Sequence, residues 1–148
     1  MDSHQEVERK FDLAPDQEVP DLARGPVAVV GEPVVTELVA TYFDTAHLAL
    51  AAAGITLRRR TGGSDAGWHL KLPKVGDARV ELHRPLGRGT RTVPKQLLDQ
   101  VRAVVRDHAL APVAGLRTTR VERHLFDADG VDLAVVADDT VEAERLTG

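Results

Sequence analysis

The chain has 148 residues, 43% hydrophobic side chains and no cysteine, so it can bury one domain core but cannot form disulfides or thiolate metal sites. Its formal net charge of -4 argues against nucleic acid as the main partner, because proteins that bind phosphate backbones usually present a positive face. No apolar run reaches membrane-spanning length and the acidic start is unlike a signal peptide, so we expect a soluble, cytoplasmic protein without a membrane partner.

The first expected element is a strand over residues 6–13, "EVERKFDL". Its period of two places ionisable side chains on one face and Phe11 on the other. Phe11 is one of the few large side chains from which we expect the core to be built, together with Tyr42, Phe43, Trp68 and Phe126. The prolines of residues 14–26 predict a loop with one helical turn.

A second strand is predicted over residues 34–45, where β-branched and aromatic residues are frequent. Asp44 and Thr45 close this strand, and either could cap a short helix over residues 46–54 that ends at Gly54. Strands over residues 55–60 and 68–73 follow. The glycines and Asp65 of residues 61–67 predict a hairpin loop between them.

The second half of the chain contains one clear helix between two groups of strands. Residues 78–86 are predicted to form a strand, and residues 88–110 begin as a loop and become a helix. The helix has an apolar stripe at helical spacing, which consists of Leu97, Leu98, Val101, Val104 and Val105. Residues 116–146 read as a final hairpin that turns at "DADG", residues 127–130.

Five of the predicted strands carry ionisable side chains on one face. These side chains are Glu6, Glu8, Lys10 and Asp12 on the first strand, Arg58 and Arg60, then His69 and Lys71, then Arg79, Glu81 and His83, and finally Arg120, Glu122 and His124. For any single strand the ordinary interpretation is a solvent-exposed polar face. The concentration of Arg and Lys on some strands and of paired Glu on another favours a shared interior instead.

A shared interior would need a ligand that compensates both signs of charge. Isolated buried charges cost several kcal/mol each, and a polyanion with a divalent cation would remove that penalty. Carboxylates are suitable ligands for Mg²⁺ or Mn²⁺, and Arg binds phosphate oxygens in a bidentate manner. The pattern therefore predicts a metal and phosphate site, with Arg59 on the opposite face in a structural role and His69, His83 and His124 as lining residues.

The order of these segments resembles the CYTH domain, or triphosphate tunnel metalloenzyme superfamily. The resemblance begins with Glu6-x-Glu8-x-Lys10 and continues through "ATYFDT", "AGITLRRR", "GWHLKLP", "ARVELHRPL", "LRTTRVERHLFDADG" and "VADDTVEAERL". It covers about residues 5 to 147 and is closest to the N-terminal CYTH part of actinobacterial CYTH-CHAD proteins. It implies an α+β, mainly antiparallel fold, a closed or nearly closed β-barrel with a few flanking helices.

The resemblance also implies roles for individual residues. Glu6, Glu8 and Lys10 would be catalytic. Phosphate would be bound by Lys10, Arg58, Arg60, Lys71, Arg79 and Arg120, with Arg117 and Arg123 ranked lower. Metal would be bound by Glu6, Glu8, Glu81 and Asp138, although the period of the strand leaves Asp139 open as an alternative to Asp138.

The implied activity is Mg²⁺- or Mn²⁺-dependent hydrolysis of inorganic triphosphate or short polyphosphate. Two alternatives stay open: a polyphosphate-binding module without activity, and a nucleotide or organic triphosphate enzyme of the adenylate cyclase or thiamine triphosphatase type. Family members usually continue past "ERL" into a strand with a second Glu-x-Glu. We therefore expect residues 1–148 to be a CYTH domain that lacks its C-terminal strand, with a CHAD domain following in cis.

Overall fold

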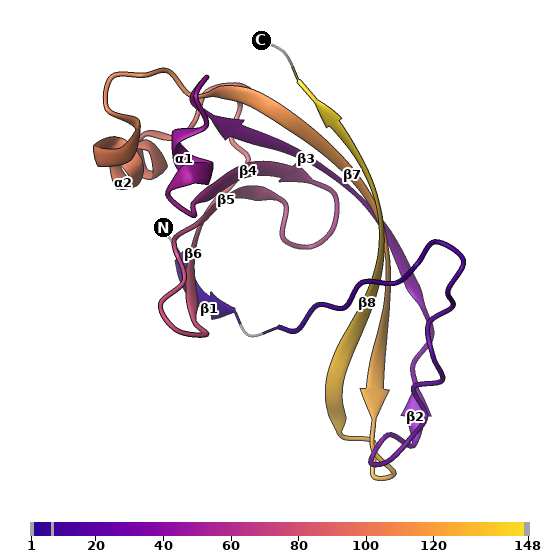
Figure 1. The fold of residues 1–148 in the computed structure, drawn as a ribbon. Coiled ribbons are helices and arrows are strands. Elements are labelled where there is room, and N and C mark those ends of the chain that lie inside the picture. Colours follow the sequence, from indigo (N-terminus) through magenta and orange to yellow (C-terminus); the bar gives the residue numbers. More distant parts are fainter. Residues whose placement is uncertain (1, 7, 147–148) are drawn as a thin grey trace. The chain divides into compact units, whose positions relative to one another are not determined.

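The computed structural model describes residues 2–6 and 8–146, which form a mainly antiparallel β-sheet with two helices (Figure 1). The elements are β1 (Asp2–Glu6), β2 (Val29–Val30), β3 (Val34–Asp44), α1 (Ala49–Ala52), β4 (Thr56–Thr61), β5 (Gly67–Lys71), β6 (Arg79–Arg84), α2 (Lys95–Val105), β7 (Ala111–Phe126) and β8 (Asp132–Arg145). The hydrogen-bonded strand order is β1-β6-β5-β4-β3-β7-β2, and β8 also pairs with β7. The expected strand-rich fold with few helices is confirmed.

The chain divides into two compact units. The first contains the described parts of residues 1–8, 38–117 and 142–148, and the second contains residues 9–37 and 118–141. β3, β7 and β8 contribute residues to both units, whereas β4, β5, β6 and both helices belong to the first.

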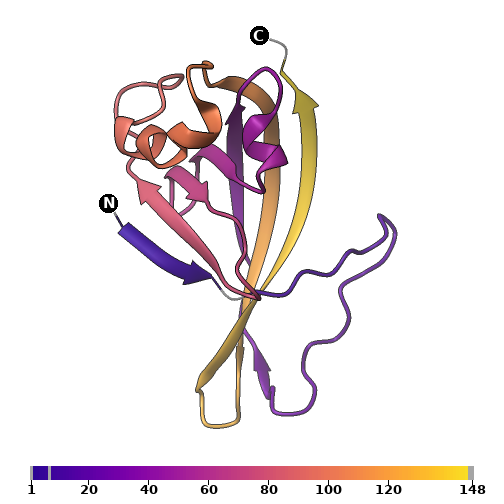
Figure 2. The same cartoon turned by 60° about the vertical axis from the view of Figure 1, so that its left-hand side comes forward.

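The core of the first unit lies between the helices and one face of β4, β5 and β6 (Figures 1 and 2). From the strands, Leu57, Trp68 and Leu70 are at most 1% exposed. The ring of Trp68 packs against that of Phe43, with the centroids 5.0 Å apart. Helix α2 contributes its apolar stripe to this core: Leu97, Val101 and Val105 are buried, and Val104 packs against them. The helices therefore cover this face of the sheet.

Helix α1 has only four residues and depends on the end of β3 for its hydrogen bonds. The buried carboxylate of Asp44 accepts hydrogen bonds from the backbone N–H groups of Thr45, Leu50 and Ala51, at 2.7, 2.9 and 3.1 Å. The hydroxyl of Thr45 accepts another from Ala49 N–H at 3.0 Å. Both predicted capping residues thus contribute, and together they satisfy amides that a short helix cannot pair internally.

The second unit contains the β7–β8 hairpin and the short strand β2. At the turn, Asp127 Oδ1 accepts hydrogen bonds from the N–H groups of Asp129 and Val131, both at 2.9 Å, and Gly130 takes a φ of +81°. β2 pairs with β7 in the register Val29 to Phe126 and Val30 to Leu125. The predicted turn at "DADG" is confirmed.

The structure corrects three expectations. The first strand ends at Glu6, and residues 8–13 are irregular, so the predicted strand over residues 6–13 is wrong. Phe11 is 83% exposed and is therefore no core residue. Residues 14–26 contain turns but no helical turn, and no pattern in the sequence predicts β2 just after them. The alternation of charged residues continues past Glu6 into an irregular segment, and it therefore predicts a strand where none forms.

Among the helices of the described residues, none has both the length and the apolar character needed to cross a bilayer.

Candidate phosphate-binding site

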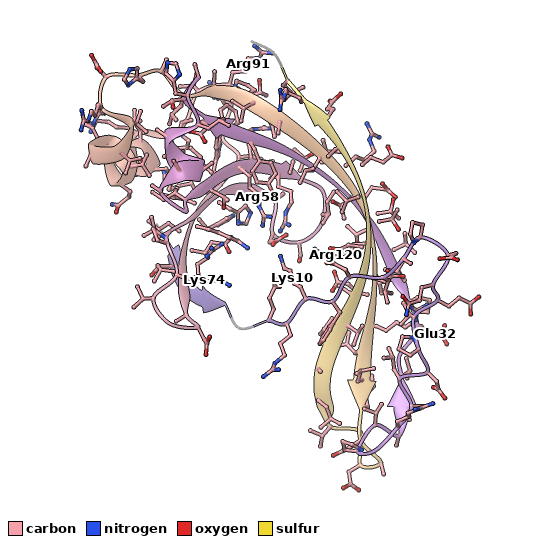
Figure 3. The ribbon with its side chains drawn as sticks, viewed as in Figure 1. Lys10, Glu32, Arg58, Lys74, Arg91 and Arg120 are labelled. Carbon is pink, nitrogen blue, oxygen red and sulfur yellow. The ribbon has the colours of Figure 1, made fainter. Side chains whose placement is uncertain are left out.

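Three neighbouring strands of the first unit place their ionisable side chains on the sheet face opposite the helices. Arg58 on β4 is opposite His69 on β5, which is opposite His83 on β6. One register step away, Lys71 on β5 is opposite Glu81 on β6. Because Leu57, Trp68 and Leu82 alternate with these residues and face the core, the charged residues share the other face. Figure 3 shows Arg58 on the side of β4 away from α1 and α2.

Glu81 on β6 contacts two side chains of β5. Its side chain is only 5% exposed. Its Oε1 lies 2.5 Å from Nδ1 of His69, which is 3% exposed, and its Oε2 lies 3.9 Å from Nζ of Lys71. The carboxylate of Glu81 is therefore surrounded by positively charged or proton-donating groups from β5.

The hydrogen bonds of His69 determine where its protons lie. Nε2 is 2.7 Å from the backbone carbonyl oxygen of Asp65, which can only accept, so Nε2 carries a proton and donates it. Nδ1 faces the Glu81 carboxyl group, so these two groups share one further proton between them. His69 thereby joins β6 to the hairpin loop that connects β4 and β5.

The pKa of Glu81 reports the balance of forces at this position. Burial alone would raise the pKa of the carboxyl group, but the hydrogen bond with His69 and the charges of Lys71, His69 and Arg58 outweigh it and lower the pKa from 4.5 to about 2. Glu81 is consequently ionised at neutral pH although it is buried.

Arginine side chains supply most of the positive charge. Arg60 on β4 is 6% exposed and forms an ion pair with Asp65. In the described part of the chain, the buried Nε atoms of Arg58 and Arg79 have no hydrogen-bond partner. The same holds for Arg59 and Arg84 on the helix-covered face, so the feature that distinguishes the charged face is its lysine, histidine and carboxylate neighbours. This face can accept a multivalent anion.

Several predicted site residues lie on β1 or just after it. The backbone of Glu6 is opposite Arg79 in the β1–β6 pairing, and the side chain of Glu6 lies outside the described residues. Glu8 and Lys10 are exposed in the irregular segment that follows, where Figure 3 labels Lys10. The structure thus places Glu6 beside the predicted phosphate-binding Arg79 in register, whereas Glu8 and Lys10 do not share its strand.

Four further predicted residues belong to the second unit: Arg120, Arg123, Asp138 and Asp139. Arg117 lies at the end of a segment of the first unit. Arg120 on β7 binds Asp139 on β8 through two hydrogen bonds, Nε to Oδ1 at 2.8 Å and Nη2 to Oδ2 at 2.7 Å. Asp138, the predicted metal ligand, instead lines an open pocket of about 510 Å³ with Arg123 and the segment 17–22. Asp138 and Asp139 therefore have different environments. Asp139, the alternative metal ligand, contacts Arg120, a predicted phosphate-binding residue.

The described side chains do not by themselves form the predicted metal centre. Within residues 2–6 and 8–146, no described group of three or more His, Asp or Glu side chains is arranged to hold an ion. Glu81, which was predicted as a metal ligand, directs its oxygens at His69 and Lys71. The metal assignments of Glu6, Glu8, Glu81 and Asp138 accordingly stay predictions.

The sequence pattern identifies the charged residues of this face but predicts only a lining role for His69, because no second histidine lies at metal-binding spacing. The available signal was the alternation itself, which puts His69 on the same face as Lys71 and next to the strand that carries Glu81. The diagonal contact with Glu81 depends on the register between β5 and β6, which the sequence pattern does not specify.

Comparison with known proteins agrees with this arrangement of strands. The CYTH domain family matches residues 4–145. The chain is 47% identical over 142 residues to two uncharacterized proteins of Mycobacterium tuberculosis, MT2285 of strain CDC 1551 / Oshkosh and Rv2226 of strain ATCC 25618 / H37Rv. The match covers 95% of this chain and 28% of each relative. The chain belongs to the CYTH domain family, and its mainly antiparallel sheet with few helices agrees with the fold class expected from its sequence.

Proposed function

We propose that this domain binds inorganic triphosphate or short polyphosphate on the charged face of β4, β5 and β6 and hydrolyses it with the help of a divalent metal ion. CYTH domains in general bind triphosphate substrates, and the family generally uses divalent metals. The observation that carries the proposal is the group of Arg58, His69 and Lys71 around an ionised, buried Glu81.

In this mechanism the chain mainly positions and neutralises its substrate. Arg58 and Arg79 would donate hydrogen bonds to phosphate oxygens, because their buried Nε donors have no partner among the described residues. Lys71 would add a point charge close to them. Charge that develops on the terminal phosphoryl group and the leaving phosphate would thus meet groups that are already oriented, which is how phosphoryl-transfer enzymes obtain most of their acceleration.

The divalent ion would supply further neutralisation of phosphate charge, with Mg²⁺ or Mn²⁺ as the proposed ions. Glu6 and Glu8, and one of the two aspartates of β8, are the residues proposed to hold it. Lys10 and Arg120 are proposed as further phosphate contacts. Since the described side chains do not complete such a centre, no step of the mechanism is assigned to the metal.

Phosphate release from triphosphate, with Mg²⁺ or Mn²⁺ and with EDTA, tests the proposal directly. We expect metal-dependent release by the wild-type chain, and weaker triphosphate binding by Arg58→Gln. Tight binding of triphosphate with no release under any metal condition would contradict hydrolysis.

A second function, binding of polyphosphate without hydrolysis, is favoured by one observation. Both oxygens of Glu81 are directed at basic side chains, an arrangement that holds an anion-binding surface together without exposing a carboxylate to a metal. Calorimetric titration with triphosphate, in the presence and absence of Mg²⁺, separates the two functions. Binding that is equally tight with and without metal, and no product formation, would identify the binding module.

The matched relatives are much longer than this chain, which spans 28% of their length. The activity, substrate and partners of the whole protein, including the predicted CHAD domain in cis and the cytoplasmic location, are therefore proposals.

A further inference from the structure

His69 is the most deeply buried basic side chain on the charged face, and the proposed binding of phosphate gives it no role. Its ring is 3% exposed, so it cannot contact a ligand without rearrangement. Both of its nitrogens already have acceptors, Glu81 Oε1 at 2.5 Å and the Asp65 carbonyl oxygen at 2.7 Å. A catalytic role in contact with substrate is excluded by this geometry.

The two acceptors of His69 belong to structures that carry the proposed phosphate ligands. Glu81 lies opposite Lys71 in the β5–β6 register and forms an ion pair with it. Asp65 lies in the loop between β4 and β5, and its carboxylate forms an ion pair with Arg60. One imidazole thus connects a residue of β6 with a loop that binds a residue of β4.

The loop needs such a connection because its glycines leave the backbone conformationally free. Residues 61–67 contain three glycines, and Gly62, Gly63 and Gly67 all have positive φ. At Gly67 a Cβ atom would lie 2.5 Å from the Arg84 carbonyl oxygen, so the loop end is held against β6. A hydrogen bond from a buried side chain to the Asp65 carbonyl restricts the remaining freedom of the loop.

We propose that His69 is a positioning residue: it holds Glu81 and the loop of residues 61–67 in place, and thereby fixes Lys71 and Arg60 in the geometry that binds a phosphate chain. The inference rests on the proposed phosphate binding. Hydrogen bonds that orient metal-binding side chains are the comparison, because their loss typically weakens metal affinity about 10- to 100-fold.

The test compares His69→Leu with His83→Leu in the wild-type chain background. Leucine approximately preserves the volume of histidine but donates no hydrogen bond. His83 is the comparison because it lies on the same face, with its ring centroid 4.8 Å from that of His69. Its hydrogen bond to the same loop, at the Ala66 carbonyl oxygen, is longer, 3.3 Å against 2.7 Å for His69 and the Asp65 carbonyl oxygen. The measurements are triphosphate affinity by calorimetry and amide hydrogen exchange of residues 61–67.

We expect His69→Leu to weaken triphosphate binding about tenfold and to accelerate exchange in the loop, and His83→Leu to change both by much less. His69→Gln, which can donate one hydrogen bond, should recover part of the loss. Unchanged exchange and affinity in His69→Leu, or equal effects in both variants, would overturn the proposal.

Two controls keep the outcome decisive. If His69→Leu does not fold, Glu81→Gln tests the connection of His69 with β6, and Asp65→Asn tests the ion pair between the loop and Arg60. The proposal fails if neither variant alters exchange in the loop. If the wild-type chain does not bind triphosphate, the proposed function fails, whereas the exchange measurement still decides whether His69 holds the loop.

Discussion

The charged face of β4, β5 and β6 and the β7–β8 hairpin show the same alternation of charged and apolar residues, but with different burial. Glu81 and His69 are 5% and 3% exposed, whereas Arg120 and Asp139 are 29% and 32% exposed. His124 and Asp132 at the end of the hairpin are about half exposed. Buried pairs depend on each other because water cannot replace a lost partner, whereas exposed pairs contribute little to stability. Burial therefore determines how strongly the loss of one partner of an ion pair lowers the stability of the fold.

The largest expected effect is the loss of stability in Glu81→Gln. The variant removes the carboxylate that the buried His69 and the partly buried Lys71 face, which should reduce the free energy of unfolding by about 3 kcal/mol. Urea unfolding followed by circular dichroism measures it. Asp139→Asn in the exposed pair is the control and should cost less than about 1 kcal/mol. Similar losses in both variants would show that burial does not separate the two regions.

The second effect concerns triphosphate binding by adjacent arginines on opposite faces of β4. Arg58→Gln should weaken triphosphate binding at least about tenfold, because a hydrogen bond to a charged group is lost. Arg59→Gln removes the same charge from the helix-covered face and should change affinity far less. Calorimetric titration measures both. Equal losses would mean that net charge, and not the face of the strand, controls binding.

The third effect is the acid dependence of stability. The pKa of Glu81 is about 2 in the folded chain against 4.5 for an unperturbed group, so its contribution is complete above about pH 5 and is lost as the pH falls towards 2. Glu81→Gln should flatten this part of the profile. In contrast, the pKa of Asp99 on α2 is lowered by the hydrogen bond from Lys95 at the surface, and Asp99→Asn should leave the profile almost unchanged. Unfolding free energies measured from pH 3 to 7 test this, and parallel profiles of wild type and Glu81→Gln would contradict it.

The smallest effect is expected in the hairpin. Asp132→Asn removes the partner of His124, whose Nδ1 lies 2.7 Å from Asp132 Oδ2. Because both side chains are about half exposed, the change should lower the free energy of unfolding by no more than about 0.5 kcal/mol and vanish in 1 M salt. Thermal unfolding at low and high salt measures it. A larger, salt-independent loss would mean that this pair is not simply a surface contact.

Much of the sheet could be predicted because period-two patterns describe single strands well. β3, β4, β5, β6 and the β7–β8 hairpin lie where the alternation and turn signals placed them. The apolar stripe likewise located α2. β1 could not be placed correctly, since its alternation continues into irregular chain after Glu6, and β2 has only two residues and no periodic signal.

The candidate site was predictable as a set of residues but not as a set of contacts. Alternation puts Arg58, His69 and Glu81 on one face, and the register then decides which side chains meet. The diagonal contact between His69 and Glu81 and the hydrogen bond from His69 to the Asp65 carbonyl require the pairing of three strands and the shape of a glycine-rich loop. Neither is contained in the pattern of one strand.

The two-sided character of β4, β5 and β6 also bears on how reliably the chain folds. If β5 slipped by one residue against its neighbours, His69 and Lys71 would face the helices and Trp68 would face the charged side chains. Such a misaligned hairpin would bury unpaired charge and lose its apolar contacts. It should therefore be unstable and unpair before the rest of the domain folds around it. The same alternation that creates the charged face therefore also disfavours misaligned pairing of β5 during folding.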